Sequence, residues 1–252
     1  MATDRPTIVL VHGDWADASS WTSVIERLQD AGFDVVAPPN PLRGPASDST
    51  YIADFLKTIT GPIVLGAHSY GGFVITNAAT GNPNVKALVY IDGFMPDEGE
   101  VLAALTETWK SCVTESALNP VPSDGAVDLY LRWDANSPYE GYTTCFANGV
   151  PPKQAAVLFA GQRPGAAAQF AEASGEPAWK TIPSWALIGT EDHVIPLALQ
   201  EMFTKRAGAN VTKVEAGHLS LITHPAEATE VILLAVEAAA SAAEPVGAGA
   251  SG

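Results

Sequence analysis

The sequence predicts an α/β fold with a mostly parallel, six-stranded sheet, and two observations support this. Six short runs are almost uninterrupted Val, Ile and Leu, which is typical of strands that have both faces covered. Between these runs, apolar residues recur at helical spacing. Because alternating strands and helices form βαβ units, we expect a doubly wound sheet flanked by helices. The 252 residues suit one large domain or two small ones.

The elements follow in chain order. The predicted strands are residues 7–11, 34–37, 62–66, 85–91, 184–188 and 211–214. The first helix pattern places Trp21 and Leu28 on one face, and Gly32 ends it. A second helix follows the start signal Ser47-Asp48. The last helix opens around Pro225, since proline is tolerated in the first turn.

Residues 96–179 interrupt this alternation. The segment contains helix-like pieces and many aromatic residues, and no clear strand–helix unit. We expect it to form a cap over the carboxyl edge of the sheet, with residues 1–95 and 180–240 forming the core. Residues 241–252 belong to a low-complexity stretch that begins at residue 238, and a flexible tail is expected there.

Composition argues against several partners. The formal net charge is −15 with only 13 Lys and Arg, whereas nucleic-acid binding needs clustered basic residues. The start of the chain lacks the basic and apolar regions of a signal peptide. The longest apolar stretch, residues 231–236, is too short to span a bilayer. We therefore expect a cytoplasmic protein, monomer or homodimer, that acts on a small molecule without nucleic acid or membrane.

The two cysteines, Cys112 and Cys145, do not have the spacing of metal ligands. A reduced state is the expectation for a cytoplasmic protein. A bridge between the two cysteines is the alternative.

One turn has the pattern of a strained strand-to-helix elbow. In Ala67-His68-Ser69-Tyr70-Gly71, the residues two before and two after the serine are small. Such a turn exposes a nucleophile and leaves no room for larger neighbours. The following helix points its amides and its positive dipole end at the serine. Ser69 is therefore the candidate nucleophile.

A serine needs a base, and the chain has five histidines. His12 ends the first strand in a turn, and His68 should point away from its neighbour Ser69. His193 adjoins a candidate acid, and His224 precedes the last helix. His218 follows the last predicted strand, in a loop where α/β sheets place functional groups. His218 is the predicted base.

The acid is expected between serine and histidine in the chain. Asp192 follows the strand at 184–188, with Glu191 as a neighbouring competitor and Asp92 as a second possibility. We prefer Asp192 to Asp92. The resulting order of Ser69, Asp192 and His218 is the Ser, Asp, His order of α/β-hydrolases.

The oxyanion hole needs two backbone donors. The N–H groups of Tyr70 and Asp14 are predicted, with Trp15 as the alternative to Asp14. A carboxylate beside a forming oxyanion would oppose it, so we expect the Asp14 side chain to turn outward or to find a donor.

Four stretches together resemble the α/β-hydrolase superfamily: TIVLVHGDWADASSW, GAHSYGG, SWALIGTEDHVIP and AGHLSLITHP. They are most similar to small bacterial serine hydrolases related to plant methylesterases and hydroxynitrile lyases. The resemblance covers nearly the whole core, and the insertion matches more loosely. It implies an α/β-hydrolase fold, a helical cap over the active site, and no metal or organic cofactor.

Several residues of this chain differ from those of particular relatives in the superfamily. The plant lyases carry Thr at the position of Gly13 and Lys directly after the catalytic His, where this chain has Leu219. A lyase needs that cation to stabilise departing cyanide, so its absence favours ester hydrolysis. Haloalkane dehalogenases and epoxide hydrolases have Asp at the position of Ser69 and are excluded by that criterion.

We therefore expect a carboxylic-ester hydrolase that forms an acyl-enzyme on small to medium hydrophobic or aromatic esters. Lactones or thioesters are not excluded as substrates. A cofactor-free lyase, oxygenase or perhydrolase, and a ligand receptor with little turnover, are the alternatives. Residues expected to bind the substrate are Trp15, Trp109, Trp133, Phe146 and Leu219.

Overall fold

The computed structural model describes residues 5–132 and 141–243. Within them, six strands form one sheet in the order β2-β1-β3-β4-β8-β9, with every neighbouring pair parallel. The bounds are β1 (Thr7–Val11), β2 (Val35–Val36), β3 (Ile63–Ser69), β4 (Val85–Gly93), β8 (Ser184–Gly189) and β9 (Asn210–Val214). The predicted α/β fold with a parallel six-stranded sheet is confirmed.

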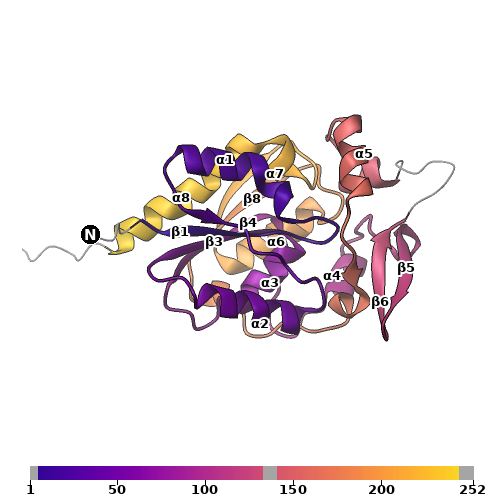
Figure 1. Ribbon diagram of the computed structural model, residues 1–252, viewed down its shortest axis with the longest axis horizontal. Helices are drawn as coiled ribbons and strands as arrows, with labels where there is room; N and C mark the ends of the chain where they lie inside the picture. The colour runs from indigo at the N-terminus through magenta and orange to yellow at the C-terminus, as the bar shows by residue number, and fades with distance from the viewer. Residues whose placement is uncertain (1–4, 133–140, 244–252) are drawn as a thin grey trace, which may run out of the picture.

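Helices cover both faces of this sheet (Figure 1). On one face lie α1 (Thr22–Asp30) and α8 (Pro225–Ala243), and on the other lie α2 (Pro45–Leu56) and α3 (Tyr70–Ala78). A further helix, α6 (Leu197–Ala207), follows β8 in the chain. Because both faces are covered, every residue of the central strand β3 is buried. This explains why the strands are continuous apolar runs in the sequence.

The insertion lies at the carboxyl end of the strands, on the right in Figure 1. It contains α4 (Leu102–Thr108), α5 (Pro152–Ala160) and an antiparallel sheet of β5 (Leu118–Ser123), β6 (Ala126–Leu131) and β7 (Gly165–Ala166). Shorter helical turns are η1 (Ala18–Trp21), η2 (Glu115–Ala117), η3 (Tyr142–Phe146), η4 (Ala167–Phe170), η5 (Ala178–Lys180) and α7 (Ser220–Thr223).

The expected helical cap is therefore only partly helical. The turn between β5 and β6 is Asp124-Gly125, and both residues have positive φ, 36° and 80°. A two-residue turn of this kind matches the twist of a hairpin, and Asp-Gly is among its strongest sequence signals. The sequence carries this turn signal, but the strands on either side of it lack the apolar runs by which the core strands were predicted.

A disulfide joins Cys112 to Cys145, with 5.8 Å between their Cα atoms. The expectation of reduced cysteines was therefore wrong. Their separation of 33 positions in the sequence hid the pairing, because only the fold of the insertion brings the two segments together. Disulfides persist in oxidising compartments, so this bond does not fit the expected cytoplasmic location. That location stays a prediction.

The C-terminal helix continues further than expected. α8 runs to Ala243, so residues 241–243 are helical and do not belong to a flexible tail. The remaining residues of the predicted tail lie outside the described part of the chain. In that described part, no helix combines the length and apolar character needed to cross a bilayer.

Candidate active site

Ser69 is the last residue of β3, and α3 begins at the next residue. Its backbone has φ 54° and ψ −127°, a conformation that a non-glycine residue adopts only at a cost. A Cβ added to Gly71 would lie 2.6 Å from the carbonyl oxygen of Val11, and one on Gly13 would lie 2.6 Å from Cβ of Ser69. The strained elbow therefore depends on glycine at both positions.

Three of the predicted residues meet in this elbow. Nε2 of His218 accepts the hydroxyl proton of Ser69, with 2.9 Å between nitrogen and oxygen. Nδ1 of His218 donates to Oδ2 of Asp192 across 2.8 Å. These two hydrogen bonds require the tautomer with the proton on Nδ1. Ser69 and Asp192 are each 3% exposed and His218 is 0% exposed, so the chain of contacts is shielded from bulk water.

Asp192 is held in place by donors from its own loop. Its Oδ1 accepts from the N–H groups of Val194 at 2.8 Å and Ile195 at 2.9 Å, and its Oδ2 accepts from the Gln200 amide at 3.0 Å. The competitor Glu191 is exposed. The carboxyl of Asp192 is therefore oriented toward His218.

Burial governs the electrostatics of the pair. It lowers the pKa of His218 to about 3, so the imidazole is neutral at neutral pH and can accept a proton. Burial also raises the pKa of Asp192, against the opposing effect of the N–H groups of Ile195 and Val194. A neutral imidazole beside an anchored carboxyl is the state that a general base requires.

The alternative acid Asp92 is fully buried beneath the same loops. Its Oδ1 accepts from the N–H of Gly189 at 2.6 Å, and its Oδ2 accepts from the N–H and the hydroxyl of Ser220. Burial, followed by the nearby charge of Asp192, raises the pKa of Asp92. Asp92 thus connects Gly189, the last residue of β8, to Ser220, which follows His218 by two positions. The sequence did not reveal this supporting role.

The other histidines have separate partners. His12 accepts from the N–H of Asn40 through Nε2 and donates to the carbonyl of Gly13, and burial lowers its pKa to about 4. His68 donates from Nε2 to the backbone carbonyl of His218 at 2.8 Å. The two remaining histidines contact neighbouring oxygens through Nδ1: His193 the carbonyl of Thr144, and His224 the hydroxyl of Thr223.

The two predicted oxyanion donors lie beside Ser69. Tyr70 is the first residue of α3, so its N–H has no acceptor within the helix. Asp14 and Tyr70 both line a small cavity that also contacts Ser69. Their placement is compatible with two amides converging on one oxygen.

The side chain of Asp14 differs from the expectation. It is 3% exposed rather than turned outward, and its Oδ1 has no hydrogen-bond partner among the described residues. Burial raises the pKa of Asp14 to about 7. The amide of Gln169 lies near enough to oppose this rise without reaching hydrogen-bond geometry, while Asp48 adds to it. Burial thus favours the neutral acid of Asp14 beside the predicted oxyanion hole.

The predicted substrate-binding residues occupy different places. Trp15 lines the cavity, and its indole N–H donates to the carbonyl of Leu129 at 2.9 Å. The ring of Phe146 lies 5.6 Å from that of Trp15 and 5.2 Å from that of His218. Leu219 is buried. Trp109 packs against the core at the end of α4, away from the lining, and Trp133 lies outside the described residues.

Sequence reasoning missed most of the cavity wall. Its apolar residues from outside the predicted set are Phe94, Leu102, Val113, Phe170 and Val194. They come from both the core and the insertion, and only Phe170 carried a signal, as one of the aromatic residues in residues 96–179. The cavity measures about 20 Å³, which is room for about one water molecule.

Two relatives share recognisable sequence with this chain. A "Carbendazim hydrolyzing esterase" of Nocardioides sp. (strain SG-4G) is 34% identical over 110 residues, which cover 38% of this chain and 46% of the relative. An "Alpha/beta hydrolase nvfD" of Aspergillus novofumigatus (strain IBT 16806) is 23% identical over 244 residues, 88% of this chain and 92% of the relative. The first of these matches is thus limited to about half of the relative's length.

Solved structures show the same fold. A pyrethroid hydrolase from Sphingobium faniae JZ-2 superposes with a TM-score of 0.75 at 20% identity, over 94% of this chain and 99% of that one. Polyneuridine aldehyde esterase gives a TM-score of 0.74 at 20% identity, over 91% of this chain and 98% of that one. The methylesterase MES16 from Arabidopsis gives a TM-score of 0.71 at 16% identity, over 92% of this chain and 99% of that one.

A sequence model of the "Alpha/beta hydrolase family" matches residues 8–231. The matched range includes all of the parallel sheet except Thr7, as well as the insertion and the elbow with its histidine and acid. The chain therefore belongs to the α/β-hydrolase family.

Proposed function

We propose that this protein is a serine hydrolase that cleaves carboxylic esters through an acyl-enzyme. The observation that carries the proposal is the buried chain of hydrogen bonds from Ser69 Oγ to His218 Nε2, and from His218 Nδ1 to Asp192 Oδ2. A nucleophile, a neutral base and an orienting carboxyl in this geometry are the parts that acyl transfer needs.

In the proposed mechanism, Ser69 Oγ attacks the acyl carbon while its proton passes to His218 Nε2. The negative charge on the former carbonyl oxygen is held by the N–H groups of Tyr70 and Asp14. As the intermediate collapses, the bond to the alcohol breaks and His218 returns the proton to that alcohol. Water then attacks the acyl group with His218 again as base, which releases the acid and restores Ser69.

The relatives support ester hydrolysis by their names. The Nocardioides protein and polyneuridine aldehyde esterase are named as esterases, and the Arabidopsis protein is named as a methylesterase. The largely apolar wall of the cavity supports hydrophobic or aromatic esters as substrates.

The site also argues against a cyanohydrin lyase. Any side chain at Gly13 would collide with Ser69, so the Thr of the plant lyases does not fit this backbone. Leu219 is an apolar, buried residue where those lyases have Lys. The site thus lacks both residues that set the plant lyases apart.

The test is a panel of p-nitrophenyl esters assayed with the wild type and Ser69→Ala. We expect turnover of short esters by the wild type and a loss of about 10⁴-fold or more in the variant. Equal turnover by both proteins would contradict the proposal. Tight ligand binding without turnover would favour a receptor instead, and cyanide release from mandelonitrile would favour a lyase.

A further inference from the structure

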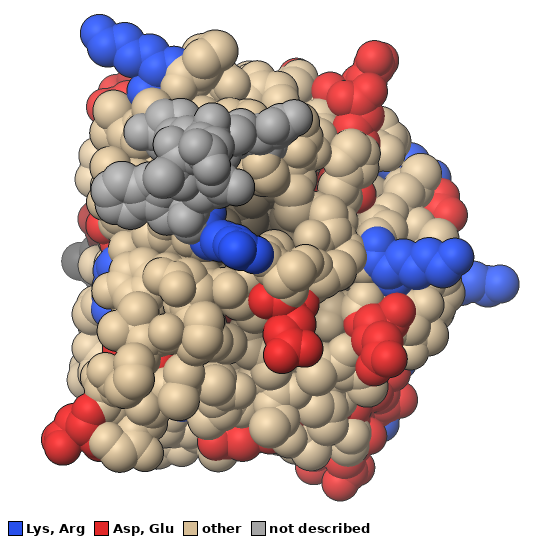
Figure 2. All heavy atoms as spheres, turned by 90° about the vertical axis from the view of Figure 1, so that its right-hand side faces the viewer, with Lys and Arg blue, Asp and Glu red and all other residues tan. Residues whose placement is uncertain are grey.

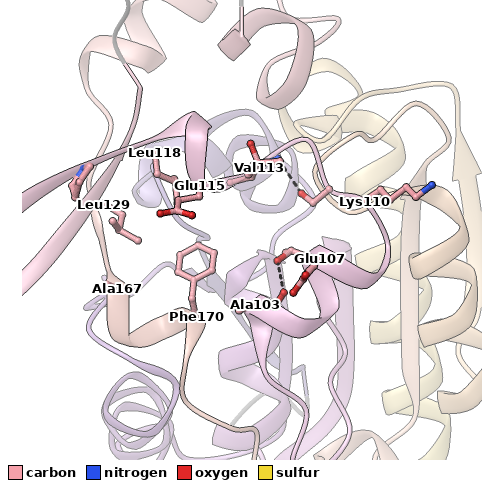
Figure 3. A pocket seen from close by; sticks show the side chains of 13 residues that line it. Ala103, Glu107, Lys110, Val113, Glu115, Leu118, Leu129, Ala167 and Phe170 are labelled. Atoms are coloured by element: carbon pink, nitrogen blue, oxygen red, sulfur yellow. Dashed lines mark hydrogen bonds between the residues drawn. The ribbon is translucent and has the colours of Figure 1, made fainter.

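A groove runs between α4 and the β5–β6 hairpin, outside the cavity at Ser69 (Figure 3). Its volume is about 810 Å³, within the ~300–1,000 Å³ range of pockets that bind small molecules. Much of its wall is apolar: Ala103 from α4, Leu118 and Pro120 from β5, Leu129 from β6, and Phe170 from η4. The groove is large enough for a ligand that the cavity of about 20 Å³ could not hold.

The groove and the cavity share part of their walls. Thr106, Ser111, Val113 and Phe170 line both of them. These four residues, which we call the neck, therefore form the common wall between the groove and the cavity lined by Ser69. In Figure 3 the ring of Phe170 points into the groove, toward Glu115 and the hairpin.

We propose that the groove binds the far end of an extended, apolar ester, whose carbonyl reaches Ser69 through the neck. This inference rests on the proposed ester hydrolysis and names its substrate class. Phe170 is only half-buried, so its ring has solvent beside it into which it can move when an ester enters. Each methylene placed against the apolar wall should improve binding about fourfold, so longer tails should bind better until the groove is filled.

The charges at the groove narrow the substrate class further. In Figure 3, the Glu115 carboxylate lies between Leu118 and Phe170, whereas Lys110, which also lines the groove, points its ammonium group away from Phe170. Glu107 adds a second carboxylate from α4. On the face that the insertion presents, acidic and basic side chains are dispersed among uncharged atoms (Figure 2). A tail that ends in a carboxylate should therefore be disfavoured against an uncharged tail of the same length.

Two substrate series test which part of the ester occupies the groove. p-Nitrophenyl esters from acetate to dodecanoate lengthen the acyl part, and acetate esters from methyl to decyl lengthen the alcohol part. We expect kcat/KM to rise with length in one series and to level off when the groove is full. A rise in either series supports the proposal and identifies the part that is bound. If kcat/KM rises with length in neither series, the proposal is overturned.

Two neighbouring alanines of α4 provide a matched pair of variants. Ala103 and Ala104 are both exposed, but only Ala103 lines the groove. Ala103→Trp should lower kcat/KM for the long esters by about tenfold, as the loss of two buried methylenes would, and leave acetate turnover unchanged. Ala104→Trp should change neither. Equal effects of the two variants on long esters would overturn the proposal.

Leu118→Ser removes apolar wall without adding bulk, and it keeps the test valid should the Trp variant fail to fold. It should also reduce the preference for long esters. Glu115→Gln should raise kcat/KM severalfold for an ester with a carboxylate at the end of its tail, mainly at low salt, and leave the uncharged ester unchanged.

The two proposals fail in different ways. If short esters are cleaved in a Ser69-dependent manner without any length preference, the groove proposal is wrong and ester hydrolysis stands. If no ester of either series is cleaved, both are wrong.

Discussion

Asp92 and Asp192 are neighbouring buried carboxyls whose partners give them different roles. Asp192 accepts from Nδ1 of His218, whereas the oxygens of Asp92 accept from Gly189 and Ser220. In the proposed mechanism, Asp192 rather than Asp92 is therefore placed to stabilise the imidazolium that forms when His218 takes a proton. Asp92 is a positioning residue, because it fixes the loops on which Asp192 and His218 lie.

Substitution separates these two roles. Asp192→Asn should lower kcat by about 10⁴-fold, since an amide neither stabilises the imidazolium nor selects the required tautomer. Asp92→Asn should cost up to about a hundredfold, through displacement of the reacting groups. Steady-state kinetics with a short ester measure both, with Glu191→Gln as the exposed control. If Asp92→Asn is as damaging as Asp192→Asn, the assignment of the acid is wrong.

Asp14 should make the activity sensitive to pH. Burial raises its pKa to about 7, so its carboxyl is neutral below this pH and ionised above it. An ionised carboxyl beside the oxyanion would oppose the developing charge, so kcat/KM should fall as pH rises through about 7, by up to ~10-fold per pH unit. A pH–rate profile of the wild type measures this fall.

Asp14→Asn is the matched control for that profile. The variant has nearly the same shape and cannot ionise, so its activity should not fall across this range. The same fall in the variant would show that another group controls it.

At the scale of elements, the disulfide connects two parts of the insertion that meet at the site. Cys112 lies between Ser111 and Val113, which line the neck, and Cys145 precedes Phe146, which packs against the ring of His218. Closing a loop of this length stabilises a fold by about 3–4 kcal/mol in the loop-entropy account. The bond therefore holds together the wall of the cavity as well as the insertion.

Reduction should affect both stability and activity. Adding a reductant should lower the melting temperature and the esterase activity, since the neck and the Phe146 segment are then free to separate. Calorimetry and ester turnover with and without dithiothreitol measure these effects. The double variant Cys112→Ser/Cys145→Ser is the control, because it should behave like the reduced wild type and be insensitive to reductant. An unchanged melting temperature on reduction would contradict this role.

Some secondary-structure elements were predicted from the sequence more accurately than others. The strand at residues 7–11 was predicted with the observed bounds, because a buried parallel strand leaves a continuous apolar signal. The third strand was predicted to end at Gly66 but continues to Ser69, since polar residues can extend a strand when the fold supplies their partners. The β5–β6 hairpin is largely exposed and lacks the apolar run of a core strand.

At the scale of the whole molecule, the carboxyl ends of the strands bring together residues that are far apart in the chain. Ser69 and His218 are 149 residues apart, and the parallel sheet places both at the edge that the insertion covers (Figure 1). The small cavity is lined by the core on one side and by the insertion on the other. We therefore expect both parts of the molecule to determine the substrate preference of the proposed esterase.

The sequence alone was sufficient to predict the parallel sheet, the elbow at Ser69 and the meeting of His218 and Asp192 at that elbow. These features depend on local requirements, namely apolar runs, small residues at a tight turn and loops after strands, which each leave a mark in neighbouring positions. The tertiary structure decided the disulfide, the supporting place of Asp92, the burial of Asp14 and the residues of the neck. These features arise from contacts between distant segments, whose packing no short stretch of sequence records.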